Sequence, residues 1–424
     1  MYFLSASLWY TKHMQESSRY AVGIDIGTTT VRCVVGHVDP STGIPTVVGI
    51  GQAPNSGMRK GYVANLAGPA KAIDDALGEA ERMSGYEVNE AVLSLNGPHI
   101  ISTNTDGMIA VGAASHEITD EDIARVEEVA TVGKIPPNRE IIEVVPRDFR
   151  LDGQDGIKDP LGMTGTRLEI SANVVSALSP YAVNVRKVAD MATVTPHDIV
   201  PSVLASAKAV LGEKQLESGV AVIDLGGATT GVAVFEEGDL HYVGVVPIGG
   251  MHVTNDLAIG LKTSPETAEE VKVKHATAVV RSDKEGLSVK QGDEILTFDS
   301  EEIDEIVEAR LEEIFDGIEA ELKKAGRAGK LPSGVVLVGG GAKLKRVADY
   351  TRERLGMAVT LGAPSGFGGV DERIEQPEFA AAVGLMFADM EESTGVSAKS
   401  TSGNSALSGG LVHGIKKVFK KLKF

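Results

Sequence analysis

The sequence predicts an α/β protein with two similar lobes, and three observations carry that prediction. The chain has 424 residues, well beyond the roughly 150 residues of one average domain. Residues 20–36 and 219–235 share a pattern in which an apolar strand ends near an Asp, a Gly and two Thr follow, and a second β-branched strand begins. A repeated hairpin of this kind indicates duplicated lobes. The rest of the chain alternates between strand-like and helix-like apolar spacing, which is typical of α/β layers.

Composition narrows the possible classes of function. Apolar residues make up 42% and charged residues 24% of the chain, values that argue against a wholly disordered or an integral membrane protein. No apolar run reaches the roughly 18 residues that a membrane-spanning helix needs. The single cysteine, Cys33, excludes an internal disulfide and a Cys-based zinc or iron–sulfur site and fits a reducing compartment. The net charge of −18 argues against general nucleic-acid binding.

The first lobe is expected to follow a leader. Residues 1–19 lack the charged flank and the cleavage pattern of a signal peptide, so we interpret them as a leader, with Met14 as an alternative start. The first lobe is assigned to 20–85 and 167–211. Its helices are expected where apolar residues recur on one helical face, at 69–85 and 196–211.

The remaining segments differ in pattern. Residues 86–166 are expected to form a small inserted α+β subdomain with a strand, an acidic helix and a strand, at 91–95, 120–132 and 140–145. The second lobe is assigned to 212–390. Residues 391–410 are rich in Ser, Thr and Gly, which predicts a flexible linker. The basic segment 411–424 follows the linker.

The second lobe contains a long helix and a glycine cluster. The helix is predicted over 301–326 from its apolar stripe, with Asp299 or Ser300 as its N-cap. A strand then runs into the glycines of 335–343, and a helix over 344–355 follows. This cluster suits close backbone approach to a flat ligand. It matches neither the P-loop nor the dinucleotide-binding fingerprint.

The two hairpin turns are the first candidate site. Gly at a turn lets the backbone approach a ligand and present successive N–H groups to an anion, and Thr hydroxyls add donors. A single Gly-Thr turn is more often only a turn, but two turns that face each other from two lobes can clamp a polyphosphate. Asp25 and Asp224 stand at the strand ends, where they supply the hard oxygen ligands of a hydrated Mg²⁺. The alternative is that both residues only cap their turns.

A second candidate pair lies between the second hairpin and the glycine cluster. Glu269 and Lys272 are three residues apart, so on a helix they share one face, where they fit the sugar hydroxyls and the base of a nucleotide. Taken alone, the pair is better explained as a solvated ion pair.

The last segment, 411–424, is predicted to be an amphipathic helix. At roughly 21 Å such a helix is too short to span a membrane. Its apolar residues fall on one helical face and its lysines on the other, which predicts that it lies on anionic lipid. The predicted membrane contacts are Leu411, Val412, Ile415, Lys416, Lys417, Val418, Phe419, Lys420, Lys421 and Leu422. The alternatives are a surface helix of the body, disfavoured by the linker, and a nucleic-acid tail, disfavoured by the continuous apolar stripe.

The order of these motifs resembles the actin-like ATPase superfamily. A first phosphate hairpin, a connecting helix, a second phosphate hairpin, an adenosine motif and a second connecting helix match in order, at 23–36, 196–211, 220–235, 335–343 and 378–389. The insert is similar to the relocated subdomain of the pilus-assembly protein PilM and of the FtsA family of bacterial cell-division proteins. The basic end is similar to the FtsA membrane anchor. By this resemblance, which covers 20–390, the chain is identified as a member of the FtsA family.

The resemblance implies an actin-like ATPase fold that binds ATP and Mg²⁺. Asp25 and Asp224 would hold the metal through water. The implied nucleotide contacts are Gly27, Thr28, Thr29, Gly226, Gly227 and Thr229 at the phosphates, Gly250, Glu269 and Lys272 at the ribose and base, and Gly339, Gly340 and Gly341 beside the adenine.

One departure from the superfamily concerns hydrolysis. Relatives that hydrolyse ATP well orient the attacking water with a Gln or Glu near the start of the first connecting helix, and the corresponding position here is Val200. A valine cannot accept or position a water proton. Lys208 is the nearest polar replacement, and a lysine is a poor base unless it is desolvated. We therefore expect nucleotide binding with at most a weak ATPase activity.

The resemblance also implies partners and a location. The protein would polymerise on the cytoplasmic side of the cell membrane at the division site, as a peripheral protein that binds anionic lipids, the C-terminal tail of FtsZ and downstream division proteins. Arg310 looks like the family's basic contact for the acidic FtsZ tail, and an ordinary ion pair with Glu305 or Glu313 is the alternative. The competing functions are a PilM-like pilus scaffold, disfavoured by the lysine-bearing end, and a sugar or acetate kinase or chaperone ATPase on the same fold.

Overall fold

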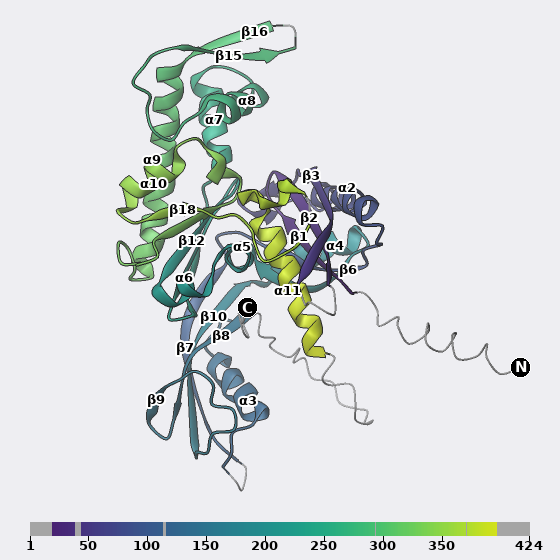
Figure 1. Ribbon diagram of the computed structural model, residues 1–424, viewed down its shortest axis with the longest axis vertical. Coiled ribbons are helices and arrows are strands. Elements are labelled where there is room, and N and C mark those ends of the chain that lie inside the picture. Colours follow the sequence, from purple (N-terminus) through teal and green to yellow (C-terminus); the bar gives the residue numbers. More distant parts are fainter. Residues whose placement is uncertain (1–18, 39–43, 113–115, 293, 370, 397–424) are drawn as a thin grey trace, which may run out of the picture.

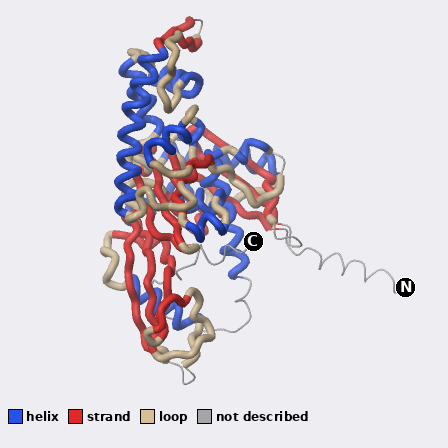
Figure 2. Tube along the Cα trace, turned by 60° about the vertical axis from the view of Figure 1, so that its left-hand side comes forward, coloured by secondary structure: helices blue, strands red, loops and turns tan. Residues whose placement is uncertain are grey.

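The structure is a computed structural model that describes residues 19–38, 44–112, 116–292, 294–369 and 371–396. Two five-stranded sheets form the middle of the molecule, a largely helical upper subdomain lies at one end of the long axis, and a smaller sheet with one helix lies at the other (Figures 1 and 2). The predicted α/β fold with two lobes and an α+β insert is confirmed. The predicted leader up to residue 18, the linker from 397 and the amphipathic helix lie outside the described residues.

The two central sheets share one topology. In each sheet three antiparallel strands are joined by two further strands that run parallel to the first, in the orders β3-β2-β1-β6-β11 and β14-β13-β12-β17-β18. The first sheet consists of β1 Arg19–Ile26, β2 Thr30–Val38, β3 Pro45–Pro54, β6 Glu90–Leu95 and β11 Thr195–Pro201. The second sheet consists of β12 Val220–Leu225, β13 Thr230–Glu236, β14 Asp239–Val246, β17 Val335–Val338 and β18 Val359–Leu361. The repeated hairpin of the sequence therefore opens each of two equivalent sheets.

Two helices join the lobes. α5 (Ser202–Val210) and α11 (Ala380–Val396) pack against each other beside the two sheets (Figure 1). Val203 of α5 belongs to a core that includes strands of both lobes, whereas Ala382 of α11 lies in a core with β1 and β2 of the first lobe. α11 therefore contributes to the first lobe, although the prediction assigns it to the second. It also continues to Val396, past the predicted start of the linker at 391.

The predicted helix over 196–211 is wrong in its first part, because Thr195–Pro201 form strand β11. Val200 precedes Pro201, and a proline disfavours helical backbone at the residue before it. The β-branched side chains of Ile199 and Val200 also suit a strand. Pro196 and the Asp that follows it resemble a helix start in the sequence, but here they stand at the beginning of a strand.

The insert is a four-stranded sheet covered by one helix. The strand order is β7-β10-β8-β9, and α3 packs on β7 and β10. α3 begins with a capping box between Thr119 and Asp122. The elements of the insert are β7 Ile101–Ala110, α3 Asp120–Thr131, β8 Arg139–Leu151, β9 Gln154–Ile157 and β10 Arg167–Leu178.

Both predicted boundaries of the insert, 86 and 166, differ from this arrangement. β6, which the prediction places in the insert, pairs with β1 in the first-lobe sheet, and β10, which it places in the lobe, lies between β7 and β8 in the insert sheet. The spacing of apolar residues predicts that a segment is a strand, but it does not predict which strands lie beside it in a sheet, because strand pairing depends on residues far apart in the chain. After Glu90, β6 is apolar except for Ser94, and mostly apolar runs are typical of strands buried on both faces of a parallel sheet.

The upper subdomain and the outer helices complete the fold. The side chain of Asp299 caps α9 by accepting a hydrogen bond from the N–H of Glu301 at 2.9 Å, as predicted. The upper subdomain contains α7 Gly250–Gly260, α8 Pro265–His275, β15 Gly286–Gln291, β16 Glu294–Asp299 and α9 Ser300–Lys324. The outer elements are β4 Met58–Arg59, β5 Tyr62–Val63, α2 Ala67–Ser84, α4 Ser179–Met191 and α6 Glu213–Ser218.

After β17 the chain makes a short 3-10 turn, η1 (Gly340–Lys343), and then forms α10 (Val347–Leu355). The helix predicted over 344–355 therefore begins three residues later than expected. Two further 3-10 turns, η2 (Glu372–Glu375) and η3 (Pro377–Phe379), lead into α11. Within the described residues, no helix combines the length and the apolar character needed to cross a membrane.

Candidate functional site

A cavity of about 670 Å³ opens between the two lobes. The turns of both hairpins, the first turns of α5, helices α7 and α8, and the glycine turn after β17 all contribute to its walls. Every residue predicted to contact a nucleotide or its metal lines this one cavity: Asp25, Gly27, Thr28, Thr29, Asp224, Gly226, Gly227, Thr229, Gly250, Glu269, Lys272, Gly339, Gly340 and Gly341. Segments from the whole length of the chain therefore meet at one place.

The turns of the two hairpins face each other. A Cβ added to Gly227 would lie 3.0 Å from Cγ2 of Thr29 and 3.6 Å from Cβ of Thr28, so the turns approach within van der Waals distance. Both turns are equally tight, because a Cβ at Gly27 or Gly226 would lie 2.6 or 2.8 Å from a carbonyl oxygen three residues further along the chain. Glycine at these positions lets a ligand approach the backbone of both turns closely, although the N–H of Gly226 itself donates to the carbonyls of Asp224 and Thr229, both at 3.0 Å.

Two largely buried carboxylates stand behind the turns, one from each lobe, with Asp25 the more fully buried of the two. Burial raises the pKa of Asp25, against the opposing effects of Arg32 and of a hydrogen bond from Ser94. Burial, and then repulsion by Asp25, raise the pKa of Asp224 to about 6, although Ser206 donates a hydrogen bond to its Oδ2 at 3.0 Å. Two acids that repel each other in a buried place favour a cation between them.

This donor set fits Mg²⁺ held together with a polyphosphate. Among the described residues, no group of three or more His, Cys, Asp or Glu side chains could hold a metal ion by itself. Mg²⁺ characteristically keeps several waters and is bound through one or two carboxylates plus phosphate oxygens. Asp25 and Asp224 would supply the carboxylates.

The third group of predicted residues lines the other end of the cavity. The Nζ of Lys272 donates to Oε2 of Glu269 at 2.6 Å, to Oγ1 of Thr254 at 2.8 Å and to the carbonyl of Gly250 at 3.2 Å. Glu269 and Lys272 are thus an ion pair, as the alternative interpretation has it, and both residues line the cavity, with Lys272 largely covered and Glu269 about half exposed. Its hydroxyl, carboxylate and ammonium groups suit a ribose and a base.

The glycine turn after β17 reaches the metal end of the cavity. Gly339 has a φ of +81°, which is a conformation that favours glycine. A side chain at Gly339 would overlap Oδ1 of Asp224, and a Cβ at Gly341 would lie 2.7 Å from Cβ of Leu225. Glycines at these two positions therefore let the adenosine motif pack directly against the end of β12.

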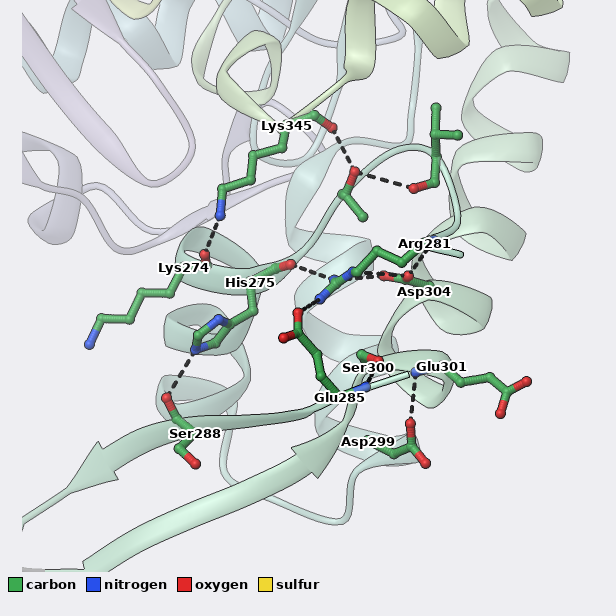
Figure 3. A network of polar contacts seen from close by, with 12 residues as sticks. Lys274, His275, Arg281, Glu285, Ser288, Asp299, Ser300, Glu301, Asp304 and Lys345 are labelled. Carbon is green, nitrogen blue, oxygen red and sulfur yellow. Dashed lines mark hydrogen bonds and ion pairs between the residues drawn. The ribbon is translucent and has the colours of Figure 1, made fainter. Parts of the chain in front are cut away.

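A polar network connects the cavity wall to the upper subdomain (Figure 3). Lys345 lines the cavity, and its Nζ donates to the carbonyl of Lys274 at the end of α8 at 2.7 Å. Close by, the guanidinium of Arg281 donates to Oδ1 of the buried Asp304 on α9 at 2.7 Å and to the carbonyl of His275 at 2.6 Å. These contacts hold the loop after α8 between the cavity and α9.

Several residues that line the cavity were missed by sequence reasoning. They are polar or charged residues: Arg32, Asn96, Ser202, Ser206, Lys343 and Glu378. Ser202 and Ser206 could have been found, because they are four residues apart on one face of α5. Asn96 could also have been found, since it is followed by a glycine directly after a strand.

Arg32 differs from the other basic residues of the cavity. Lys343 pairs with Glu378 at 2.7 Å, and Lys272 and Lys345 have the partners described above. Arg32 lies opposite Asp25 in the β1–β2 pair, and its guanidinium stacks over the ring of Phe379 at 5.4 Å. Its buried Nε finds no hydrogen-bond acceptor in the part of the chain that the structure describes. An arginine with unused donors in a cavity suits an anionic ligand.

The assignment of the water-positioning residue to Val200 is wrong. Val200 lies in β11, is only 2% exposed and does not line the cavity. The polar side chains that α5 presents to the cavity are Ser202 and Ser206. Lys208 forms an ion pair with Glu391 of α11 at 2.5 Å and lies outside the cavity wall. The register of α5 differs from the expected one because the helix begins only after Pro201.

Arg310, the predicted contact for an acidic peptide, lies on α9 away from the cavity. Its guanidinium forms ion pairs with Asp256 of α7 and with Glu313, and its side chain is 22% exposed. Of the two predicted ion-pair partners, Glu313 is the one observed. The predicted membrane contacts from Leu411 to Leu422 lie outside the described residues.

The two-lobed fold places the protein in the actin-like class. It is similar to the PilM–PilN type IV pilus biogenesis complex, with a TM-score of 0.64 and 19% identity over 87% of this chain and 98% of that one. It is also similar to the crystal structure of MreB5 of Spiroplasma citri bound to ADP, with a TM-score of 0.53 and 14% identity over 90% of this chain and 99% of that one. These likenesses show the fold.

Sequence comparison then gives the family. Residues 221–384 match the family model described as "Cell division protein FtsA", and residues 97–176 match "SHS2 domain inserted in FTSA". The chain is 34% identical to cell division protein FtsA of Pseudomonas aeruginosa, over 92% of this chain and 94% of that protein. It is 35% identical to the Bacillus subtilis protein of the same name, over 86% and 82%. The chain belongs to the FtsA family of cell division proteins.

Proposed function

We propose that the protein binds ATP with Mg²⁺ in the cavity between the lobes. The facing turns at Gly27–Thr29 and Gly226–Thr229 would hold the phosphates through backbone N–H and hydroxyl groups. Glu269 and Lys272 would contact the ribose and base. Mg²⁺ would supply positive charge to the phosphates, and Asp25 and Asp224 would orient its bound waters.

One observation carries this proposal: the two hairpin turns and the two buried carboxylates, one of each from each lobe, line a single cavity. A turn at the end of one hairpin is common, but two matched sets that converge on one space suit a charged ligand such as a polyphosphate with its metal ion. Burial and the charge of Asp25 raise the pKa of Asp224, so a bound cation would stabilise the charged form of this carboxylate. The solved MreB5 relative, described as bound to ADP, supports a nucleotide as that ligand.

Hydrolysis in this site would be slow. The side chains that α5 presents to the cavity are the small hydroxyls of Ser202 and Ser206, and Ser206 already donates to Asp224. Neither hydroxyl has the basicity that a general base near neutral pH needs. At most a weak ATPase activity is expected, so nucleotide binding would serve mainly to set the conformation of the two lobes.

In the cell the protein would act as an adaptor of the division ring. The segment 411–424 would lie on anionic lipid at the cytoplasmic face of the membrane, and polymerisation would strengthen that weak attachment through multivalency. The acidic tail of FtsZ would bind near Arg310, in competition with Glu313 for the guanidinium. Later division proteins would be recruited to the same filament. Family membership favours this role over the pilus scaffold suggested by the PilM likeness.

Nucleotide titration of the purified full chain tests the site. A fluorescent ATP analogue is titrated in the presence of Mg²⁺ against the wild type, Asp224→Ala and the control Asp316→Ala, whose carboxylate is exposed and pairs with Arg354. The proposal expects weaker binding only for Asp224→Ala. Unchanged affinity in that variant would remove the metal assignment, and no binding by the wild type would remove the nucleotide site.

Sedimentation with vesicles tests the attachment. The full chain is expected to sediment with vesicles that contain anionic lipid, and a chain that ends at residue 410 is expected to stay in the supernatant. Equal sedimentation of both chains would exclude the segment 411–424 as the anchor.

A further inference from the structure

The outer edge of the second-lobe sheet is closed by the insert. β14 is an edge strand of that sheet, and an exposed edge leaves every second backbone N–H and C=O unpaired. Strands β7, β8 and β10 of the insert contact β14, and Figure 1 shows them running away from the second-lobe sheet. The insert is thus connected to the first lobe through the chain and to the second lobe through non-covalent contacts.

Three side chains of the insert bond to alternate residues of β14. The hydroxyl of Ser102 on β7 accepts from the N–H of Val243 at 2.9 Å and donates to its carbonyl at 3.2 Å. Asn173 of β10 donates to the carbonyl of His241 at 3.0 Å. Lys158 forms an ion pair with Asp239 at 2.5 Å. The side chains of Ser102 and Asn173 thus bond to backbone groups that a further strand would pair with, and Lys158 adds a side-chain ion pair.

Both chain segments that meet at the Ser102–Val243 contact come directly from the cavity. Asn96, six residues before Ser102, lines the cavity, and so does Gly249, six residues after Val243. A Cβ at Gly61 would lie 2.9 Å from Cγ2 of Thr229 and 3.1 Å from Gly97, so the segment after Asn96 also lies close to the second hairpin turn. The chain from Asn96 to Ser102, the contact of Ser102 with Val243, and the chain from Val243 to Gly249 therefore form a short closed path that begins and ends at the cavity.

Ring stacking and hydrogen bonds hold the neck of the insert, where the chain enters near His99 and leaves near Ser176. The ring of His99 stacks on Tyr181 of α4 at 4.3 Å, with 9° between the planes. Arg139 donates to the carbonyls of His99 at 2.5 Å and Ser176 at 2.8 Å, which ties the incoming and outgoing strands together. The lobes cannot move apart while this neck keeps its shape unless the contact on β14 changes.

We infer that the contact between the insert and β14 is a brace coupled to the nucleotide cavity. A nucleotide that binds both hairpin turns fixes the distance between the lobes. At that distance, Ser102, Asn173 and Lys158 reach β14. The nucleotide therefore tightens the brace, and linkage requires the brace to tighten nucleotide binding by the same factor. This coupling rests on the proposed nucleotide site, whereas the brace itself does not.

Hydrogen exchange at the Val243 amide reports the brace directly, because Ser102 is its hydrogen-bond acceptor. In Ser102→Ala this amide is expected to exchange at least about tenfold faster, while neighbouring β14 amides that face β13 keep their rates. The matched control is Ser171→Ala on the insert, where the hydroxyl bonds to Asp106 and not to β14. Equal exchange at Val243 in the wild type and in Ser102→Ala would overturn the brace.

Two further measurements test the coupling. Mg·ATP should slow exchange at Val243 in the wild type, and Ser102→Ala should bind Mg·ATP about fivefold more weakly although Ser102 is not in the cavity wall.

A zero-length carbodiimide should link Lys158 to Asp239 more efficiently with Mg·ATP present, while the Lys284–Glu301 pair in the upper subdomain reacts equally in both conditions. Nucleotide binding without these changes would overturn the coupling. A wild type that binds no nucleotide would instead remove the proposed function, and the exchange comparison would still decide the brace.

Discussion

The two lobes have the same sheet but protect its edge in different ways. In the first lobe, the edge of β3 is covered by backbone at its start, since Val47 donates to the carbonyl of Gly368 and Gly368 donates to that of Pro45, both at 2.8 Å. In the second lobe, the edge of β14 is closed by side chains of the insert. The segment with Gly368 follows the last strand of the second lobe, and the insert grows out of the first. Each lobe therefore covers the open edge of the other.

This exchange shows how a duplicated sheet can gain different roles. The first edge has a backbone partner that leaves little freedom, whereas the second depends on three polar side chains that can separate and re-form. The phosphate end of the cavity remained symmetric, with one turn and one buried carboxylate from each lobe. Matched substitutions in the two lobes should therefore change the free energy of unfolding by different amounts. They should change the affinity for Mg·ATP by similar amounts.

The largest expected effect concerns glycines in the two edge strands β3 and β14. An alanine at Gly51 of β3 would overlap the backbone carbonyl of Ala76 in α2, whereas an alanine at Gly244 of β14 would meet the side chains of Glu321 and Tyr242. Backbone cannot move aside and side chains can, so Gly51→Ala should cost about 3 kcal/mol of unfolding free energy and Gly244→Ala about 1 kcal/mol. Denaturant unfolding of both variants measures the difference.

The control for this pair is Gly78→Ala, at a position on α2 with no neighbour within 4 Å. Alanine there should be neutral or should stabilise the protein by about 0.5–1 kcal/mol. Equal losses for Gly51→Ala and Gly244→Ala would contradict the difference in packing between the two lobes.

The next effect should be equal in the two lobes. Asp25→Asn and Asp224→Asn each remove one carboxylate that would orient water on Mg²⁺, and each should weaken Mg·ATP binding by about tenfold or more. Calorimetric titration at a fixed Mg²⁺ concentration measures both. Loss in only one of the two variants would show that the metal belongs to one lobe and that the site is not symmetric.

A pH effect should arise at Asp224. Because the pKa of Asp224 is raised to about 6, Mg·ATP affinity should fall as the pH decreases through that value, by up to about tenfold per unit. Stability without nucleotide has the opposite sign: a raised pKa in the folded state stabilises the protonated form, and this contribution is lost as the pH rises through about 6. The phosphates of ATP titrate in the same way with either protein. Asp224→Asn, which lacks the carboxyl group, should therefore show a flatter profile of affinity against pH. Parallel profiles for the two proteins would show that the pH dependence arises from groups other than Asp224, among them the nucleotide and Asp25, whose pKa burial also raises.

The smallest effect should come from Arg32, which has no counterpart at the matching turn of the second lobe. Arg32→Gln should reduce affinity a few-fold for ATP and less for AMP, because its unused donors suit a phosphate near Asp25. Arg373→Gln removes an exposed guanidinium paired with Asp371 and serves as control. An equal loss for ATP and AMP would give Arg32 a structural role through its contact with Phe379.

Much of the candidate site could be predicted because its residues belong to short local patterns. A strand that ends in Asp and Gly before two Thr specifies its own turn, so Asp25, Gly27, Asp224 and Gly226 could be found without knowledge of the fold. The long helix α9 was equally clear, since its apolar stripe and the cap at Asp299 are local.

The remainder depends on contacts between distant residues. β6 is a strand in the sequence, but only its pairing with β1 places it in the first lobe. Val200 occupies a strand because of the proline after it and the pairing with Ser94. Arg32 lies within the first hairpin, but nothing in the hairpin pattern marks an arginine, and it faces the cavity because β2 pairs with β1 in one register.

A series of nucleotides tests the central claim most directly, which is that turns from both lobes hold one polyphosphate. Affinities of the full chain for ATP, ADP, AMP and adenosine are measured with and without Mg²⁺. The account predicts that affinity falls with each phosphate removed and that Mg²⁺ strengthens ATP and ADP binding but not adenosine binding. Adenosine bound as tightly as Mg·ATP would show that the facing turns hold no phosphate and would contradict the account.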